Sequence, residues 1–271
     1  MADMVFCNSE LVENYVHYRP TPPDELIATV VNFVKEKRPL PLQVCVDVGC
    51  GSGQSTWLYS SHFQQVFGLD VSLEQLEAAK RTSFHNVVYK EGMAESMPFE
   101  DNSVDLVTSC EAAHWFNLEK FCAEVDRVLC PGGVLACYGY SFCKPTFAGR
   151  NLRLTMEELS HSVERYRTEG HKHLLSDYTT LPDFYPEEVV VRSSKGKFSV
   201  ESDATLDSIL GYISTWSSFG KLKSFEGEEA SAKFLLNCKQ KLLDAMGTKE
   251  ENVLMKRRYD YFLRMWRKPS A

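Results

Sequence analysis

Short apolar runs alternate with amphipathic stretches through the first half of the chain. The runs have the character of buried strands and occupy 43–48, 65–70, 86–90, 104–109 and 134–140. Between them, apolar residues recur at three- and four-residue spacing, which is typical of helices with one buried face. Strands that alternate with helices in this way predict a parallel α/β sheet. The expected helices are 24–37, 54–62, 73–81 and 118–129.

The second half of the chain has a different rhythm. It contains no repeat, no low-complexity segment and no long linker, so we expect it to belong to the same domain as the first half. Its periodicity predicts helices over 148–169, 203–219 and 228–246, a strand or hairpin over 187–200 with Gly196 at its turn, and a last strand over 253–267.

The first strand runs into three glycines at alternate positions, Gly49, Gly51 and Gly53. A backbone that turns this sharply needs residues without a Cβ, and it leaves free N–H groups at the start of the next helix. Such a turn can approach a nucleoside closely. The spacing is neither the Gly-x-Gly-x-x-Gly of dinucleotide-binding folds nor a P-loop, because no Gly-Lys-Ser/Thr follows. An NAD-dependent dehydrogenase is therefore disfavoured.

Two acidic residues accompany this turn. Asp70 ends the second strand, at the edge where open parallel sheets bind ligands, and its carboxylate could accept both ribose hydroxyls of a nucleoside. Taken alone, Asp70 fits a helix-capping role equally well, but the upstream turn favours ligand binding. Asp47 is interpreted as an acid that orients the amides of the turn and faces a cationic ligand group. The alternative for Asp47 is a strand-end acid satisfied by the backbone.

Composition and charge exclude several classes of function. Hydrophobic residues make up 44% and charged residues 25% of the chain, as in ordinary globular proteins, and the net charge of −7 argues against a nucleic-acid partner. Nine cysteines without a Cys-x-x-Cys pair indicate a reducing compartment, and neither a disulfide framework nor a metal site is expected. Acidic residues in 1–30 exclude a signal peptide, and no apolar run suits a membrane helix. We therefore expect a cytoplasmic protein, monomeric or homodimeric, with no membrane partner.

The stretches 46–53 and 68–72 resemble the first two motifs of class I S-adenosylmethionine-dependent methyltransferases. Three later segments resemble the adenine-side loop, the fourth strand and the fifth strand of that family, in the same order. These segments are 91–99, 101–107 and 129–135. The resemblance implies a Rossmann-like, doubly wound, mostly parallel seven-stranded sheet with helices on both faces and a small helical cap over the active site.

The resemblance also implies S-adenosyl-L-methionine as the cofactor. Many relatives carry an acid for the adenine amino group where Met93 stands, so here adenine is expected to pack on Met93 and Ala94. The alternative is that Met93 fills a gap in the core. The residues expected to contact the cofactor are Tyr15, Tyr18, Arg19, Asp47, Gly49, Gly51, Asp70, Val71, Met93, Ala94 and Cys110.

Two segments outside the shared core are similar to the trans-aconitate methyltransferase-like group. These are 110–116, with its Ala-x-His-Trp pattern, and 14–20, with a Tyr-x-x-x-Arg-Pro pattern. In that group the N-terminal segment folds over the cofactor, which makes Tyr15, Tyr18 and Arg19 candidates for a lid. The arginine fork suits a methionine carboxylate. The alternative for Arg19 is a surface residue before a proline.

His114 is the candidate catalytic residue, at the mouth of the cleft on the side of the transferable methyl group. It could remove a substrate proton or position the acceptor, and we favour positioning because an ionised carboxylate needs no base. A structural histidine packed by Trp115 is the alternative. The residues expected to bind the acceptor are Trp115, Tyr140, Arg150, Tyr212 and Trp216.

The sequence thus predicts a methyltransferase that acts on a small-molecule carboxylate, hydroxyl or amine by in-line displacement. The alternatives are a nucleic-acid or protein methyltransferase, which the acidic balance disfavours, and a non-catalytic S-adenosylmethionine-binding protein, which the sequence does not separate from the enzyme. We expect one domain with an N-terminal lid and helix over 1–40, a cofactor-binding core over 41–145, a cap and substrate-selecting segment over 146–250, and a final strand over 251–271.

Overall fold

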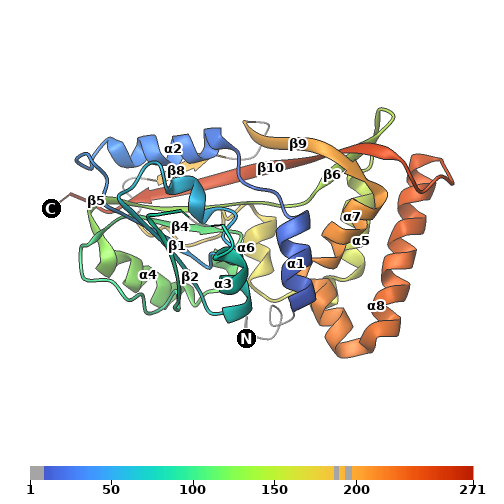
Figure 1. Ribbon diagram of the computed structural model, residues 1–271, viewed down its shortest axis with the longest axis horizontal. Helices are drawn as coiled ribbons and strands as arrows, with labels where there is room; N and C mark the ends of the chain where they lie inside the picture. Colours follow the sequence, from blue (N-terminus) through green and yellow to red (C-terminus); the bar gives the residue numbers. More distant parts are fainter. Residues whose placement is uncertain (1–8, 83, 186–188, 193–196, 271) are drawn as a thin grey trace.

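The apolar runs of the chain pair side by side in one mixed sheet with helices on both faces (Figure 1). The computed structural model describes residues 9–82, 84–185, 189–192 and 197–270. Its main strand order is β3-β2-β1-β4-β5-β10-β6-β7, with β8 and β9 also paired to β10. The strands are β1 Val44–Val48, β2 Gln65–Asp70, β3 Val87–Glu91, β4 Val104–Cys110, β5 Leu129–Tyr140, β6 Lys144–Phe147, β7 Arg150–Asn151, β8 Val189–Arg192, β9 Phe198–Thr205 and β10 Leu254–Arg267.

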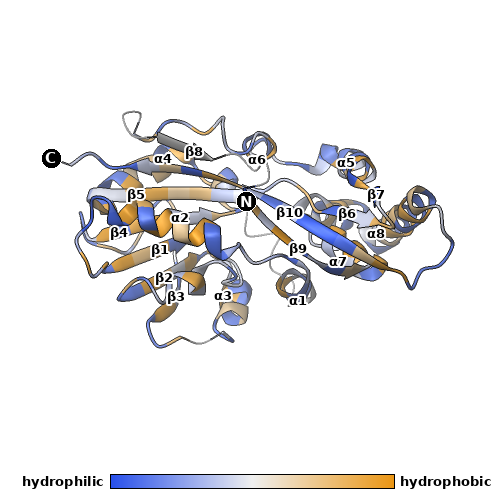
Figure 2. Cartoon of the chain, turned by 90° about the horizontal axis from the view of Figure 1, so that it is seen from above, coloured by the Kyte–Doolittle hydropathy of each residue, from blue (hydrophilic) through white to orange (hydrophobic). Residues whose placement is uncertain are grey.

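The first five strands are all parallel, which confirms the predicted α/β core. Alternate residues of β1 face opposite sides of the sheet, as strand geometry requires. Cys45 packs in the cluster that contains Leu26 of α2 (Asp24–Lys35), whereas Val46 packs in the cluster that contains Phe121 of α4 (Leu118–Val128). The two helices therefore cover opposite faces of the sheet. In Figure 2, α2 shows alternating hydrophobic and hydrophilic bands, as an amphipathic helix does.

The long last strand, β10, organises the second half of the chain. It pairs antiparallel with β5, β6, β8 and β9, so the described residues form ten strands instead of the expected seven. The additional strands come mainly from the segment expected to be a cap. The predicted hairpin turn at Gly196 lies outside the described residues.

Three of the predicted helices are wrong in extent. The stretch 54–62 forms only the short 3₁₀ helix η1 (Thr56–Tyr59), and 203–205 belongs to β9. The stretch 148–169 begins in the turn of the β6–β7 hairpin, where Ala148 and Gly149 have positive φ, and continues through β7. Only then does a helix begin, because a helix cannot continue through two left-handed residues.

The cap contains α5 (Arg153–Ser162), η3 (Glu164–Tyr166), α6 (His171–Leu175), α7 (Leu206–Ser214) and α8 (Ser217–Met246). The N-terminal helix α1 (Ser9–Tyr18) packs against α7 and against α3 (Leu73–Ala79), between the cap and the core (Figures 1 and 2). A Cβ at Gly211 of α7 would overlap the ring of Tyr18, so the glycine permits close approach of α1. Of the helices in the described residues, none is both long and apolar enough to span a membrane.

Candidate active site

The glycine turn folds back onto the strands beside it. The N–H groups of Gly49 and Cys50 both donate to the carbonyl of Leu69, at 2.8 and 2.9 Å. Gly49 has a φ of 68°, a conformation that residues with a side chain rarely adopt. A Cβ at this position would also overlap the Cβ of Ala112 in the loop after β4. The turn and that loop therefore meet at the carboxyl end of the sheet and leave no space between them for a side chain.

Asp70 holds the turn and lines the cavity beside it. Its Oδ2 accepts the N–H of Gly51 at 2.8 Å, and its Oδ1 accepts the N–H of Ser72 at 2.9 Å. Each carboxylate oxygen can accept more than one hydrogen bond, so the same group can also receive ribose hydroxyls. The structure thus shows Asp70 bonded to the backbone of the turn and of the residue before α3, and ribose binding stays a prediction.

Asp47 lies beneath the turn instead of at a cavity wall. It is fully buried and accepts the hydroxyls of Thr56 at 2.7 Å and Thr108 at 2.9 Å. Burial raises the pKa of its carboxyl to about 6, against the smaller lowering effect of the two threonines. Asp47 therefore ties η1 to β4. The structure does not place it where it would face a cationic ligand group, and its partners are side chains instead of backbone.

A cavity of about 260 Å³ opens between the glycine turn, the end of β2 and the N-terminal segment. It brings together most of the residues expected at the cofactor. Those at its wall are Tyr15, Arg19, Gly49, Gly51, Asp70, Val71, Met93, Ala94 and Cys110, with Trp115 and Tyr140 from the predicted acceptor set.

The adenine-side loop presents an apolar surface to this cavity. The side chain of Met93 is 54% exposed, so Met93 does not fill a gap in the core. Val71, which follows Asp70, is 39% exposed and lines the same cavity. Apolar groups at the wall of a cavity provide a packing surface for a planar base.

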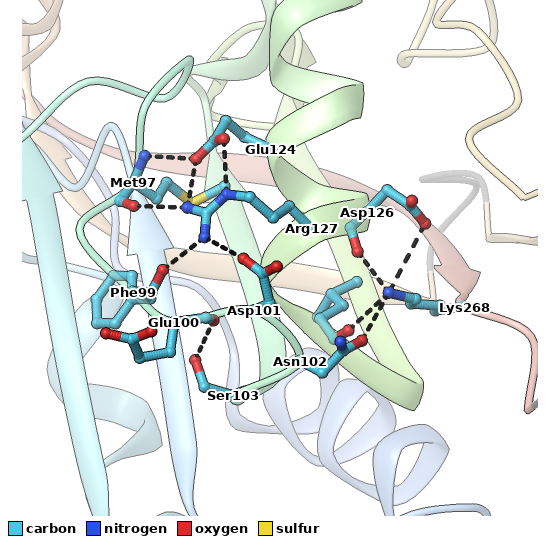
Figure 3. Close-up of polar contacts among 11 residues, drawn as sticks. Met97, Phe99, Glu100, Asp101, Asn102, Ser103, Glu124, Asp126, Arg127 and Lys268 are labelled. Carbon is cyan, nitrogen blue, oxygen red and sulfur yellow. Dashed lines mark hydrogen bonds and ion pairs between the residues drawn. The ribbon is translucent and has the colours of Figure 1, made fainter.

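Arg127 of α4 fixes the segment that follows this loop (Figure 3). Its guanidinium donates to the carbonyls of Met97 and Phe99, at 2.9 and 2.7 Å, and pairs with Glu124 and Asp101. Glu124 in turn accepts the N–H of Met97 at 2.8 Å, and its bond with Arg127 contributes most to lowering the pKa of its carboxyl. One arginine thereby positions the chain next to the base-packing surface.

Arg19 connects the N-terminal segment to the cap and to β5. It donates to the hydroxyl and carbonyl of Thr215, at 2.8 and 3.1 Å, and to the hydroxyl of Tyr140 at 2.9 Å. Its guanidinium also lies 4.9 Å from the ring centre of Tyr15 and 5.1 Å from that of Tyr212, within the range of cation–π attraction. Arg19 is thus an interior residue that lines the cavity, and the surface interpretation is wrong.

A second cavity, of about 80 Å³, adjoins the first and shares Tyr15, Arg19, Glu111 and Trp115 with it. His114 lies at its wall with α6 on the other side, since the rings of His114 and His171 are 5.3 Å apart. Other residues at its wall include Phe142, Ser160, Arg167, Tyr212, Thr215 and Trp216.

His114 is held in one orientation by Tyr178. Its Nδ1 lies 2.9 Å from the phenolic oxygen of Tyr178, which is fully buried. In the tautomer in which the phenol donates to Nδ1, the ring proton resides on Nε2. Burial lowers the pKa of His114 well below its usual range, and the nearby His171 lowers it further. His114 is thus a neutral N–H donor, which suits positioning better than proton abstraction.

Three predicted site residues, Tyr18, Asp47 and Arg150, do not reach either cavity. Tyr18 packs its ring on Gly211, where α1 crosses α7. Arg150 is exposed on the β6–β7 hairpin, with its guanidinium next to Gly247 at the end of α8. Several cavity residues are not among the predicted site residues. Glu95 and Glu111 lie inside the motif segments 91–99 and 110–116, whereas no motif contains Gln54, Ser55, Gln75, Phe142, Arg167 and His171.

Comparison with known proteins identifies the family. Residues 46–137 match the family model described as a methyltransferase domain. A protein of Dictyostelium discoideum named as a methyltransferase is 31% identical over 209 residues, which cover 76% of this chain and 75% of that protein. The chain belongs to the class I S-adenosylmethionine-dependent methyltransferases. S-adenosylmethionine is accordingly its cofactor, and the cavity beside the glycine turn fits it through Asp70 and the apolar surface of Val71 and Met93.

A Saccharomyces cerevisiae protein named as an S-adenosylmethionine-dependent methyltransferase is 26% identical to this methyltransferase over 234 residues, 75% of the chain and 78% of that protein. A solved structure named as a type II methyltransferase, from Anaeromyxobacter dehalogenans, has a TM-score of 0.71 and 25% identity. The match covers 94% of this chain and 100% of the chain in the solved structure. The predicted fold class and enzyme class are therefore confirmed. The trans-aconitate-like subgroup stays a prediction.

We predict that this methyltransferase loses folding stability in acid, because the histidines at the second cavity are neutral in the folded chain. Burial lowers the pKa of His171 to about 4, with further lowering by Arg167 and Lys221. The unfolded chain binds a proton near pH 6.5 and the folded chain does not, so the free energy of unfolding falls as the pH drops from about 6.5 to 4. His171→Gln should reduce that fall by about 1–2 kcal/mol in urea titrations at each pH, after allowance for partial exposure.

The exposed His85 provides the matched control for this prediction. His85→Gln should follow the wild-type curve. Asp47 and Glu111 have raised pKa values and act in the opposite direction, but they are present in all three proteins and cancel in the comparison. If the free energy of unfolding falls equally on acidification in the His171 variant and the wild type, the prediction is contradicted.

Proposed function

We propose that the enzyme transfers the methyl group of S-adenosylmethionine to a small-molecule acceptor in the second cavity, by in-line displacement. The observation that carries this proposal is that the two cavities are adjacent and share wall residues from the N-terminal segment and from the loop after β4. A cofactor in the first cavity and an acceptor in the second would meet at these shared residues. The bound cofactor supplies an activated methyl group, so the chain itself needs to align the acceptor and exclude water.

The residues of the second cavity suit that task. The N–H of His114 offers a hydrogen bond to the acceptor, while Trp115, Tyr212 and Trp216 provide aromatic walls. Arg19, the residue after α1, bonds to β5 and to Thr215 at the end of α7, which supports the predicted lid at the N-terminal segment. We also propose that the chain is divided into an N-terminal lid, a cofactor-binding core, a cap and a last strand.

A small acceptor fits better than a macromolecule. The second cavity is about 80 Å³ and lies under α6, α7 and the beginning of α8, with little room for a polypeptide or nucleotide segment. The net charge of −7 also opposes a nucleic-acid acceptor. The cysteine usage supports our proposal of a cytoplasmic location.

The decisive experiment incubates the purified enzyme with methyl-labelled S-adenosylmethionine and a fractionated metabolite extract. We expect S-adenosylhomocysteine to form together with one labelled small product, identified by mass spectrometry. Formation of neither product above the background of heated enzyme would favour the non-catalytic binding protein. Label in added protein or nucleic acid alone would favour the macromolecular alternative.

His114→Ala should separate acceptor positioning from cofactor binding. Loss of one hydrogen bond to the acceptor is expected to reduce turnover about tenfold. The affinity for S-adenosylhomocysteine, measured by calorimetry, should change less than turnover, because His114 lines only the second cavity. Unchanged turnover on the identified acceptor would exclude this role.

A further inference from the structure

Glu111 occupies the junction of the two cavities. It directly follows the last residue of β4 and lines both the cofactor cavity and the second cavity. Its φ of 57° is in the left-handed region, which costs a residue with a side chain of order 1 kcal/mol or more. Such strain persists only where the surrounding structure fixes it, and it is concentrated at functional sites.

The carboxylate of Glu111 is anchored through one oxygen only. Its Oε1 accepts the N–H of Tyr140 at 2.6 Å. A Cβ at Gly139 would overlap this oxygen, so β5 has a glycine where the carboxylate lies. Among the described residues, no side chain forms an ion pair with Glu111 and no group donates to its Oε2. The second oxygen is therefore available to a ligand in the cavity.

The surroundings of Glu111 bring the pKa of its carboxyl close to neutral pH. Burial raises the pKa of the carboxyl to about 7, while Arg19 and the N–H of Tyr140 lower it. Arg19 acts from a distance because its donors are committed to Thr215 and Tyr140. Other titratable or charged groups around this junction include Tyr15, Asp70, Glu95, Cys110, His114, Arg167, His171, Tyr178, Tyr212 and Tyr261. A carboxyl poised in this way can accept a proton at neutral pH.

His114 is poorly suited to that role, since its Nδ1 is occupied by Tyr178 and the ring resists protonation. We propose that Glu111 is the catalytic base of the reaction, and that the acceptor presents an amine or hydroxyl nucleophile instead of a carboxylate. This inference rests on the proposed function. The acceptor N–H or O–H gives its proton to Oε2 while its lone pair forms the bond to the methyl carbon. The carbon–sulfur bond breaks, and its electron pair stays on sulfur.

The protonation of Glu111 can be measured without an acceptor. Carbon NMR of enzyme labelled at the glutamate carboxyl carbon should show one resonance with a midpoint near pH 7, and that resonance should be missing in Glu111→Gln. Addition of S-adenosylhomocysteine at fixed pH should move this resonance, because Glu111 lines the cofactor cavity. A Glu111 resonance that titrates near pH 4.5 would overturn the proposal.

Kinetics on the acceptor identified above then test the role itself. Glu111→Gln keeps an oxygen for the N–H of Tyr140 but accepts no proton, so kcat should fall about 100-fold or more. The rise of kcat with pH near 7 should disappear, and the affinity for S-adenosylhomocysteine should change less than about threefold. Glu169→Gln, which removes an exposed carboxylate beside α6, is the matched control with wild-type kcat.

A second variant tests the same position without changing Glu111. Gly139→Ala should displace the carboxylate and reduce kcat in a protein whose circular dichroism shows a native fold. Wild-type kcat in Glu111→Gln, or a methyl ester of an acceptor carboxylate as the only product, overturns the role of Glu111 and leaves the proposed function intact. Absence of any methylated product overturns the proposed function, and the inference with it.

Discussion

Asp70→Ala is expected to reduce the affinity for S-adenosylmethionine at least 100-fold, which calorimetry would register as no measurable binding. The carboxylate of Asp70 organises the turn through the N–H of Gly51 and the helix start through the N–H of Ser72. It also lines the cavity where the ribose of the cofactor is expected. Hydrogen bonds to a charged group contribute about 1.5–3 kcal/mol each. Two lost ribose bonds therefore amount to at least a 100-fold loss.

The controls for this prediction lie on the same segment. Glu77→Ala removes an exposed acid of α3 that pairs with Lys80, so its affinity should equal that of the wild type. Asp70→Asn keeps one acceptor oxygen and should bind with intermediate affinity. Urea unfolding separates loss of binding from loss of fold. Wild-type affinity in a folded Asp70→Ala variant would contradict the assigned role of Asp70.

The sequence was informative where structure is decided locally. Gly49, Gly51 and Gly53 predict a turn by themselves, because their positive φ values are accessible mainly to glycine. The five parallel strands follow from short-range alternation of apolar runs and helices, and the structure confirms them. Asp70 could be located because it ends the strand beside that turn. These features depend on residues close together along the chain.

The sequence was uninformative where a residue contacts a partner that is distant along the chain. The turn and second strand of the β6–β7 hairpin lie inside a predicted helix, 148–169. The hairpin could not be predicted because β6 pairs with β10, more than 100 residues later, as in the pair of Thr146 with Lys256. Arg19 was ambiguous for the same reason, since its partner Thr215 is 196 residues away. Arg150 was predicted at the acceptor from its place in the segment expected to select the substrate and from its charge. Glu111 was inside a motif segment, but His114 and Trp115 carried the resemblance.

Glu111 nevertheless had a recognisable signal. An acid that directly follows a central parallel strand lies at the edge of the sheet where ligands bind, which is the argument that selected Asp70. The carboxylate of Glu111 has space only because the neighbouring strand β5 has a glycine at position 139. Sequence reasoning does not bring these two residues together. The general lesson is that strand-end acids need to be considered at every parallel strand, including those inside better-known motifs.

The last prediction compares two alanine substitutions in the glycine turn. Gly49 and Gly51 both have positive φ, 68° and 53°, so alanine costs about 1–2 kcal/mol of backbone strain at either position. The nearest atom to a Cβ at Gly51 is Oε1 of Gln75, at 3.7 Å, which is an ordinary contact. At Gly49 the Cβ would overlap Ala112 and come within 3.1 Å of Phe116. The additional cost of overpacking there is about 1–3 kcal/mol.

Gly49→Ala should therefore reduce the free energy of unfolding by roughly 3 kcal/mol, and Gly51→Ala by roughly 1 kcal/mol, in urea titrations. Because the loop after β4 carries Glu111 and His114, the clash at Gly49 should also move both side chains away from the junction of the cavities. Turnover should then fall further in Gly49→Ala than in Gly51→Ala. Equal losses of stability in the two variants would show that backbone strain alone requires glycine, and that contact between the turn and the loop does not.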